Sequence, residues 1–339
     1  MIYFDNAATT KVCDAAKTAL NNYLQENFGN PSSLHKLGIY AESSIKRAKQ
    51  TILQSFGCLE DEFIFTSGGT EANNLAIFGS VKKGHIITTV FEHASVLEPI
   101  KALEKQNVSV TYLKEVRPDT VKNVLRDDTV LVSIMAVNNE SGISMPVNDI
   151  YKVVKRHGAV FHVDAVQAFL KFNINADLIS VSGHKIHAPK GVGGLFKKKN
   201  IKLKPIFYGG GQEKNLRSGT ESVPLIMAFE AAVSDYKNEM DRLVYYLKSK
   251  YENVISAGNG ICLIDVYPLR AETVIHYMAE NDIYVSSGSA CNKNKVSHVL
   301  REMNVRNPLS VIRVSFCAEN TESEIDIFLK TLENCRIDV

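Results

Sequence analysis

The sequence predicts an α/β fold with a large, doubly wound, mainly parallel sheet domain and a smaller α+β domain. Two observations lead to this prediction. Short β-branched runs alternate with helical stretches between about residues 60 and 200, which is typical of parallel strands joined by helices. The chain has 339 residues, 45% of them hydrophobic, and is therefore long enough for one large domain and a smaller companion.

Strands are expected in the larger domain at 63–65, 86–90, 108–112, 130–134, 160–163 and 178–181. A charged amphipathic stretch from Ala228 to Tyr251 is expected to form one long helix that leads into the smaller domain. That domain includes Cys291 and the apolar strand around 311–314. We expect the larger domain to span residues 12–240, and the smaller domain to combine residues 1–11 with 241–339.

The charge and cysteine pattern of the sequence limit the kinds of molecule that the protein is expected to bind. The formal charge is only +2 and no long run carries one sign, which argues against nucleic acid or a membrane surface and favours a small substrate. The N-terminus lacks the pattern of a secretory leader and no apolar run approaches membrane-spanning length, so we expect a cytoplasmic protein. Six cysteines are scattered without a CxxC pair, which predicts reduced thiols rather than disulfides or a metal site.

A lysine and an aspartate follow successive strands of the predicted sheet. Lys185 ends the segment Ser-Gly-His-Lys, and Asp164 lies in the segment Phe-His-Val-Asp-Ala-Val-Gln before it. Ligands of such sheets collect outside the carboxyl ends of the strands. A lysine there can form a Schiff base with an aldehyde cofactor, and an aspartate can keep a pyridine nitrogen protonated. The pair therefore predicts a pyridoxal 5'-phosphate (PLP) enzyme.

A phosphate site is expected where the segment 66–74, Thr-Ser-Gly-Gly-Thr-Glu-Ala-Asn-Asn, follows a strand and opens a helix. Its glycines allow backbone N–H groups to approach an anion at the helix N-terminus. Ser182 and His184, beside the lysine, can add hydroxyl and imidazole donors. An ordinary glycine-rich turn has the same local pattern, so the surrounding motifs decide in favour of phosphate.

Three further polar residues follow predicted strands. His93 can stack on a pyridine ring or move a proton, Asn139 can bind a cofactor oxygen or a substrate carboxylate, and Gln167 can reach the phenolic oxygen of the cofactor. Each also has an ordinary interpretation, because lone histidines and Asn-rich strand exits are common in loops and turns. Together they strengthen the prediction of a cofactor site.

These motifs together resemble those of the NifS/IscS-type cysteine desulfurases, PLP enzymes of the class V aminotransferase superfamily with the fold type I of PLP-dependent transferases. The resemblance runs nearly from end to end. Its segments are 3–10, 28–33, 66–74, 92–93, 137–142, 162–165, 182–185, 209–213, 217–220 and 286–291.

The resemblance implies a role for each matching residue of the cofactor site. Lys185 would carry the cofactor and shuttle a proton, Asp164 would pair with the pyridine nitrogen, and His93 would stack on the ring. The remaining cofactor ligands would be Gly69, Thr70, Asn139, Gln167, Ser182, His184 and Thr220. In the family the threonine matching Thr220 reaches the phosphate bound by the neighbouring subunit, which implies a two-fold homodimer.

The resemblance also implies the substrate and the reaction. Arg313, assisted by Asn139, would clamp the α-carboxylate of L-cysteine, a task suited to a guanidinium. Cys291 would take the substrate sulfur as a persulfide, leaving L-alanine, and would pass it to an acceptor protein for iron–sulfur cluster assembly or for thiolation of tRNA or a cofactor. The residues around Cys291 predict a flexible, exposed loop in which Lys293 and Lys295 favour the thiolate.

Other functions remain open at this point. A selenocysteine lyase or another β-eliminating PLP enzyme would share the fold, and the Cys291 motif cannot separate sulfur from selenium. Dependence on an activating partner is also open, because the segment between Cys291 and Arg313 is shorter than in typical members with this motif. A scaffold that has lost the chemistry is a further alternative, against which the presence of Lys185, Asp164, His93 and Arg313 argues.

Overall fold

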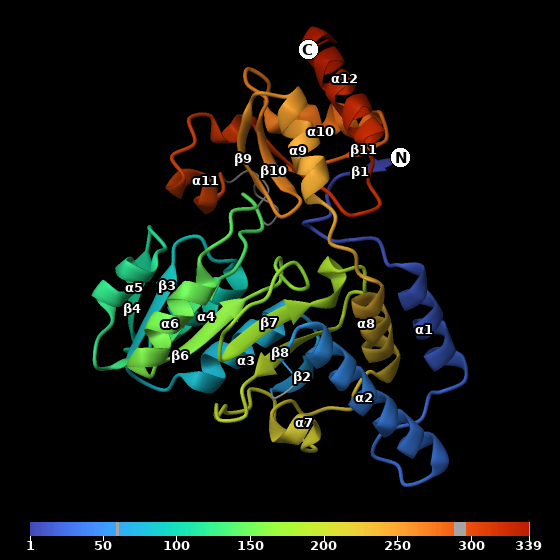
Figure 1. Ribbon diagram of the computed structural model, residues 1–339, viewed down its shortest axis with the longest axis vertical. Helices are drawn as coiled ribbons and strands as arrows, with labels where there is room; N and C mark the ends of the chain where they lie inside the picture. The colour runs from blue at the N-terminus through green and yellow to red at the C-terminus, as the bar shows by residue number, and fades with distance from the viewer. Residues whose placement is uncertain (59–60, 288–295, 339) are drawn as a thin grey trace. The chain divides into compact units, whose positions relative to one another are not determined.

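The computed structural model, which describes residues 1–58, 61–287 and 296–338, separates into two units (Figure 1). The first comprises Met1–Thr10, Val137–Ser144 and Lys237–Val339, and the second comprises Lys11–Ala136 and Met145–Tyr236. The sequence analysis assigns residues 137–144 to the larger domain, whereas in the structure they group with the first unit. Two hydrogen bonds give the reason, since Ser256 Oγ donates to the Ser141 carbonyl and Asn259 Nδ2 donates to the Gly142 carbonyl.

A seven-stranded sheet forms the centre of the second unit. Its strands are β2 (Glu62–Thr66), β3 (His85–Thr89), β4 (Ser109–Leu113), β5 (Thr129–Met135), β6 (Val160–Asp164), β7 (Leu178–Ser182) and β8 (Gly193–Lys197). Their order across the sheet is β2-β8-β7-β6-β5-β3-β4. From β7 to β4 all neighbours are parallel, whereas β8 runs antiparallel to β2 and β7. The expected α/β class with a mainly parallel sheet is confirmed, and β8 is a strand that the sequence analysis does not predict.

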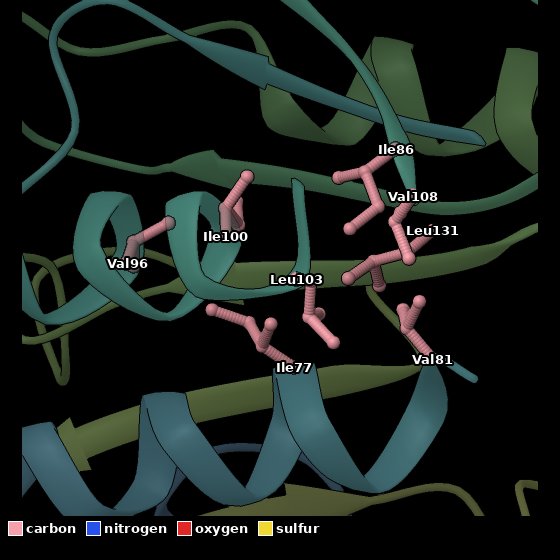
Figure 2. Close-up of a cluster of buried hydrophobic side chains, with 8 residues drawn as sticks. All are labelled: Ile77, Val81, Ile86, Val96, Ile100, Leu103, Val108 and Leu131. Carbon is pink, nitrogen blue, oxygen red and sulfur yellow. The ribbon is translucent and has the colours of Figure 1, made fainter. Parts of the chain in front are cut away.

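Helices lie on both faces of this sheet. The helices of the second unit are α1 (Asp14–Gln25), α2 (Lys36–Ser55), α3 (Gly69–Ser80), α4 (Ala94–Glu104), α5 (Pro118–Val124), α6 (Val147–His157), the short α7 (Gln212–Asn215) and α8 (Val223–Asp235), with a 3₁₀ turn at Gly183–Lys185. Figure 2 shows the core on one face, where side chains of α3 and α4 meet those of β3 and β5. On β2, Ile64 joins the α3 side, whereas the neighbouring Phe63 contacts Phe196 of β8 and Phe229 of α8. This alternation places α3 and α8 on opposite faces.

The first unit is built around a four-stranded antiparallel sheet. Its elements are β1 (Ile2–Tyr3), α9 (Asp241–Lys250), β9 (Val254–Gly258), β10 (Ile261–Asp265), α10 (Ala271–Glu280), β11 (Ile283–Tyr284), β12 (Ser286–Ser287), α11 (His298–Glu302), a 3₁₀ turn at Pro308–Ser310, β13 (Val311–Ser315) and α12 (Glu322–Asp338). The sheet order is β12-β13-β10-β9, and β1 pairs separately with β11. The strand expected around 311–314 is thus the second strand of this sheet.

The single long helix expected from Ala228 to Tyr251 is wrong, because two helices replace it. Helix α8 ends at Asp235, Tyr236 is extended, and α9 begins at Asp241. The break coincides with the passage from the second unit to the first at Tyr236. Helix α8 buries its apolar side chains in one unit and α9 buries its own in the other, so each helix follows the core of its own unit.

Within the described parts of the chain, no helix has both the length and the apolar character needed to cross a membrane.

Candidate active site

The carboxyl ends of β6 and β7 bring two of the expected site residues to one edge of the sheet. Asp164 is the last residue of β6, and Ser182 is the last residue of β7. The strands are parallel neighbours with Asp164 opposite Ser180. Asp164 is 5% exposed and Ser182 is 3% exposed, so both polar side chains lie at a buried strand end where a ligand of this fold binds.

Two hydrogen bonds hold the Asp164 carboxylate. Its Oδ2 accepts from Nδ2 of Asn73 at 2.8 Å, and its Oδ1 accepts from the backbone N–H of Val166 at 3.0 Å. Asn73 is fully buried on α3. The orientation of the carboxylate is therefore set by a helix on the face of the sheet and by its own following turn.

Asn73 also connects Asp164 to His93. The second proton of Asn73 Nδ2 points to Ser95 Oγ at 2.8 Å, and Ser95 Oγ lies 2.8 Å from Nδ1 of His93. The backbone N–H of Ser95 donates to the same Nδ1 at 3.1 Å, so Nδ1 is an acceptor and the neutral ring carries its proton on Nε2. Asn73 and Ser95 are site residues that the sequence analysis missed; an asparagine on the same helix as the buried Ala72, Leu75 and Ala76 is the signal that marks the first of them.

The turn before α3 approaches the end of β7 closely. A side chain at Gly69 would place its Cβ 2.6 Å from Cγ2 of Val166, and one at Gly68 would lie 3.7 Å from Ser182 Oγ. Thr70 follows in the first turn of α3 and is exposed. Thr70 and His93 both line a surface pocket between α3 and α4. The structure thus gathers Gly69, Thr70, Ser182 and His93 around the N-terminus of one helix, where anions bind favourably.

His184 and Lys185 lie in the 3₁₀ turn that directly follows β7. Both are half-buried. Burial, assisted by the positive charges of Lys185 and Lys190, lowers the pKa of His184 to about 4. The imidazole is therefore neutral near pH 7, and one of its two nitrogens carries a proton.

Gln167 and Thr220 occupy different environments. Gln167 is buried in the turn that follows Asp164, whereas Thr220 is exposed. The segment before Thr220 is attached to α3, because Arg217 Nε donates to Glu71 Oε1 at 2.9 Å. Glu71 in turn accepts from the backbone N–H of Ser67 through its other oxygen. This carboxylate, which the sequence analysis did not single out, ties the Thr220 segment to the glycine-rich turn.

In the first unit, Arg313 is almost completely enclosed. It is 1% exposed on β13. Its Nη2 donates to Asp5 Oδ1 at 2.8 Å, and its Nη1 donates to the main-chain carbonyl of Asn139 at 3.0 Å. Asn139 therefore meets Arg313 through its backbone, and Asp5 is an ion-pair partner that the sequence analysis did not predict.

The segment that contains Cys291 is bounded by two short elements of the first unit. On one side, Ser286 and Ser287 of β12 pair with Arg313 and Ile312 of β13. On the other side, Ser297 caps the N-terminus of α11 and donates a short hydrogen bond to Oε2 of Glu140. Cys291, Lys293 and Lys295 lie outside the described residues.

Glu140 combines burial with two favourable partners. Burial raises its pKa to about 7, while the Ser297 hydroxyl and the positive charge of Arg313 act in the opposite direction. It lies in the sequence directly after Asn139. The residues that contact Arg313 and those that border the Cys291 segment therefore belong to one cluster of the first unit.

The second unit offers a donor set that fits a phosphorylated pyridine aldehyde. A buried carboxylate suits a protonated ring nitrogen. The imidazole of His93, with its proton on Nε2, suits the ring, and Lys185 in the turn after β7 suits the aldehyde. The space at Gly69, which a Cβ would fill against Val166, allows backbone N–H groups to approach a phosphate. The residues therefore fit PLP.

Comparison with known proteins extends over both units. Residues 2–328 match the family described as Aminotransferase class-V. A cysteine desulfurase IscS of Dictyoglomus turgidum is 37% identical to this chain, over 98% of the chain and 93% of that protein. A NifS/IcsS protein homolog of Lactobacillus delbrueckii subsp. bulgaricus is 38% identical, over 98% and 96% respectively.

Solved structures agree with these relatives. A NifS-like protein superposes with a TM-score of 0.90 at 34% identity, and the match covers 100% of both chains. SspA in complex with cysteine superposes with a TM-score of 0.84 at 32% identity, covering 95% of this chain and 100% of that one.

Proposed function

This chain belongs to the aminotransferase class-V family, and from that membership we propose that it is a PLP-dependent cysteine desulfurase. The reaction converts L-cysteine and the Cys291 thiol to L-alanine and a persulfide on Cys291. The C–S bond of the substrate breaks, an S–S bond forms on Cys291, and a proton replaces sulfur on the β-carbon. Relatives named cysteine desulfurase that align with 98% of the chain support this choice of substrate.

The observation that carries the proposal is the connection of Asp164 to His93 through Asn73 and Ser95. PLP supplies an electron-accepting ring when it is bound. Asp164 would pair with the ring nitrogen, and His93 would lie against the ring with its proton on Nε2. One buried asparagine fixes both side chains, so their relative placement does not depend on the cofactor.

The other residues at this edge of the sheet divide into two groups. Lys185 Nζ would carry the cofactor and move a proton to and from the substrate, and Gln167 would donate to the phenolic oxygen. The phosphate would be bound by the α3 N-terminus and by neighbouring side chains. These phosphate ligands are Gly69, Thr70, Ser182, His184 and, from a second copy of the chain, Thr220.

The substrate ligands belong to the first unit. Arg313 would bind the α-carboxylate, and Asn139, whose carbonyl already holds the guanidinium, would assist. Cys291 would act as the thiolate that takes the substrate sulfur. The sulfur would then pass to an acceptor protein that serves iron–sulfur cluster assembly or the thiolation of tRNA or a cofactor.

We also propose that the protein is a homodimer. A second copy is needed if Thr220 is to reach a phosphate in its neighbour. An apolar surface early in the second unit supports association, because several large side chains there are exposed. They are Phe28 (70% exposed), Leu34 (94%), Leu37 (42%), Ile39 (56%) and Tyr40 (44%). Large exposed apolar surfaces mark protein–protein contacts in soluble proteins, which supports the dimer.

Alanine formation tests the proposed activity. The PLP-loaded protein, given L-cysteine and a dithiol reductant, is expected to release alanine, and Cys291→Ala is expected to release almost none. Cys58→Ala is the matched control, because burial raises the pKa of the Cys58 thiol to about 11 and so disfavours its thiolate. A yellow, PLP-loaded wild type that forms no alanine would contradict the proposal, and L-selenocysteine would be the next substrate assayed.

A further inference from the structure

The buried guanidinium of Arg313 already has a carboxylate partner. Asp5 Oδ1 lies 2.8 Å from Nη2, although the two residues are 308 positions apart. A substrate carboxylate that needs the same guanidinium must share it with Asp5 or replace it. This conflict rests on the role assigned to Arg313 in the proposed function.

The main chain fixes the position of Asp5. Asp5 forms a parallel bridge with Ser315, and the Ser315 N–H donates to the Phe4 carbonyl at 2.7 Å. The Tyr3 hydroxyl donates to the Asp5 carbonyl at 3.2 Å. The N-terminal segment therefore pairs with β13 through its backbone. This backbone pairing, and not the side chains alone, positions Asp5 beside Arg313.

Burial is unequal across the pair. The side chain of Arg313 is 1% exposed, whereas that of Asp5 is 23% exposed. A buried charge that loses its partner is strongly destabilised, whereas a carboxylate with access to water can be hydrated. Arg313 therefore requires a carboxylate at all times, but Asp5 can give up its place when another carboxylate arrives.

Asp5 leaves part of the guanidinium unused. Within the described residues, Nε of Arg313 is buried and has no hydrogen-bond partner. Nε and Nη2 share one edge of the guanidinium, and a carboxylate on that edge accepts two parallel hydrogen bonds. Meanwhile the Asn139 carbonyl holds Nη1, so the group keeps its orientation while the partner on the other edge changes.

We propose that Asp5 is a resident carboxylate ligand of Arg313 that the α-carboxylate of the amino acid substrate displaces. Asp5 keeps the guanidinium paired and oriented while the substrate is absent. It also lowers the affinity for every carboxylate, since each must compete with it, and so speeds release of the product L-alanine. Asp5 is a positioning residue that acts through Arg313.

The test compares the binding of L-alanine to three PLP-loaded proteins: the wild type, Asp5→Asn and Asp14→Asn. Binding is monitored through the change in the visible absorption of the cofactor. Asp14 is the control because its side chain is 96% exposed. Asp5→Asn is expected to lower the dissociation constant about tenfold, the equivalent of one competing charge-assisted hydrogen bond, and to lower KM for L-cysteine without raising kcat. Asp14→Asn should match the wild type.

A dissociation constant for L-alanine that rises or stays unchanged in Asp5→Asn would overturn the proposal. Asp5 would then only hold Arg313 in place. If that variant does not fold, a crystal structure of the wild type with PLP and L-alanine decides, because displacement requires that the contact between Arg313 Nη2 and Asp5 Oδ1 is broken. L-alanine binding needs no C–S cleavage. A protein that binds L-alanine but makes no alanine from cysteine therefore rejects the proposed function and leaves this test intact.

Discussion

Asn73 donates a 2.8 Å hydrogen bond to Asp164 from a fully buried position on α3. The two residues are 91 positions apart, and the contact joins the helix that opens at Gly69 to the end of β6. A buried hydrogen bond therefore joins the helix that follows the glycine-rich turn to the carboxylate that would meet the cofactor nitrogen. Changes at Asn73 should affect both protein stability and cofactor binding.

Asn73→Ala is expected to lower the free energy of unfolding by about 1–3 kcal/mol, because a buried carboxylate oxygen and the Ser95 hydroxyl each lose a partner. The PLP dissociation rate should rise in the same variant. Urea unfolding and loss of visible absorbance on dilution measure the two effects. Asn74→Ala is the control, since Asn74 follows directly on α3 and its amide donates to the Thr70 carbonyl of its own helix. Equal changes in unfolding free energy and PLP dissociation rate in the two variants would contradict the role of Asn73 in holding Asp164.

Gly69→Ala tests the close approach of the turn to Val166. Gly69 has no left-handed φ, so alanine is compatible with the backbone and only the 2.6 Å contact with Val166 Cγ2 opposes it. We expect a loss of about 1–3 kcal/mol in stability, as for other overpacked sites, together with weaker PLP binding. The double variant with Val166→Ala removes the clashing methyl and should recover most of both losses.

The informative comparison is between the double variant and Val166→Ala alone. If Gly69 is needed only because of Val166, adding Gly69→Ala to Val166→Ala should change PLP affinity little. A double variant that binds PLP as poorly as Gly69→Ala would show instead that the missing side chain serves the cofactor directly. Fluorescence titration with PLP distinguishes these results.

The sequence predicts well which polar residues lie at the strand ends. It predicts poorly the strand β8 and the break between α8 and α9. Asp164 and Ser182 could be placed at one edge because parallel strands bring their carboxyl ends together. Strand β8 was missed because it opens with Gly193 and Gly194, which have low strand propensity. The long helix was wrong because amphipathic periodicity continues through Tyr236, where the chain passes from one core to another.

Contacts between distant segments carry no local signal. Asp5 lies in an N-terminal motif whose spacing says nothing about Arg313, and only the pairing of the Phe4 segment with β13 brings them together. Ser95 likewise lies in an ordinary helix N-terminus, and nothing in its local sequence indicates its contact with Asn73. Tertiary structure creates these parts of the candidate site, so sequence patterns could not have supplied them.

Glu92 should make stability depend on pH. It is fully buried beside His93, accepts from Thr89 Oγ1 and the Met135 N–H, and burial raises its pKa to about 8. The folded state therefore holds this proton more tightly than the unfolded state, where the pKa is about 4.5. The resulting stabilisation is complete below about pH 4.5 and is lost as pH rises through about 8.

Glu92→Gln should remove this dependence, because the amide keeps an acceptor oxygen and does not titrate. Urea unfolding at about pH 5 and about pH 8 should show a fall in stability in the wild type that is smaller by at least about 1 kcal/mol in the variant. Glu98→Gln is the matched control, since the Glu98 side chain is 66% exposed. Parallel pH profiles for wild type and Glu92→Gln would contradict the assignment.

Ser297 has two functions that separate with pH. Its hydroxyl caps α11 by accepting from the N–H groups of Val299 and Leu300, and it donates to Glu140. Loss of the cap in Ser297→Ala should cost about 1 kcal/mol at any pH. Loss of the donor matters more when Glu140 is ionised, because burial raises its pKa to about 7 and the hydroxyl favours the charged form.

The stability difference between wild type and Ser297→Ala should therefore be larger at about pH 8 than at about pH 5, by about 1 kcal/mol or more. The fall in stability should also extend to higher pH in the variant, since the folded-state pKa of Glu140 rises when the donor is gone. Ser297→Thr should restore wild-type behaviour. In a Glu140→Gln background, Ser297→Ala should cost the same at both pH values, because only the cap remains to be lost. A difference that still depends on pH in that background would mean that another group than Glu140 titrates beside Ser297.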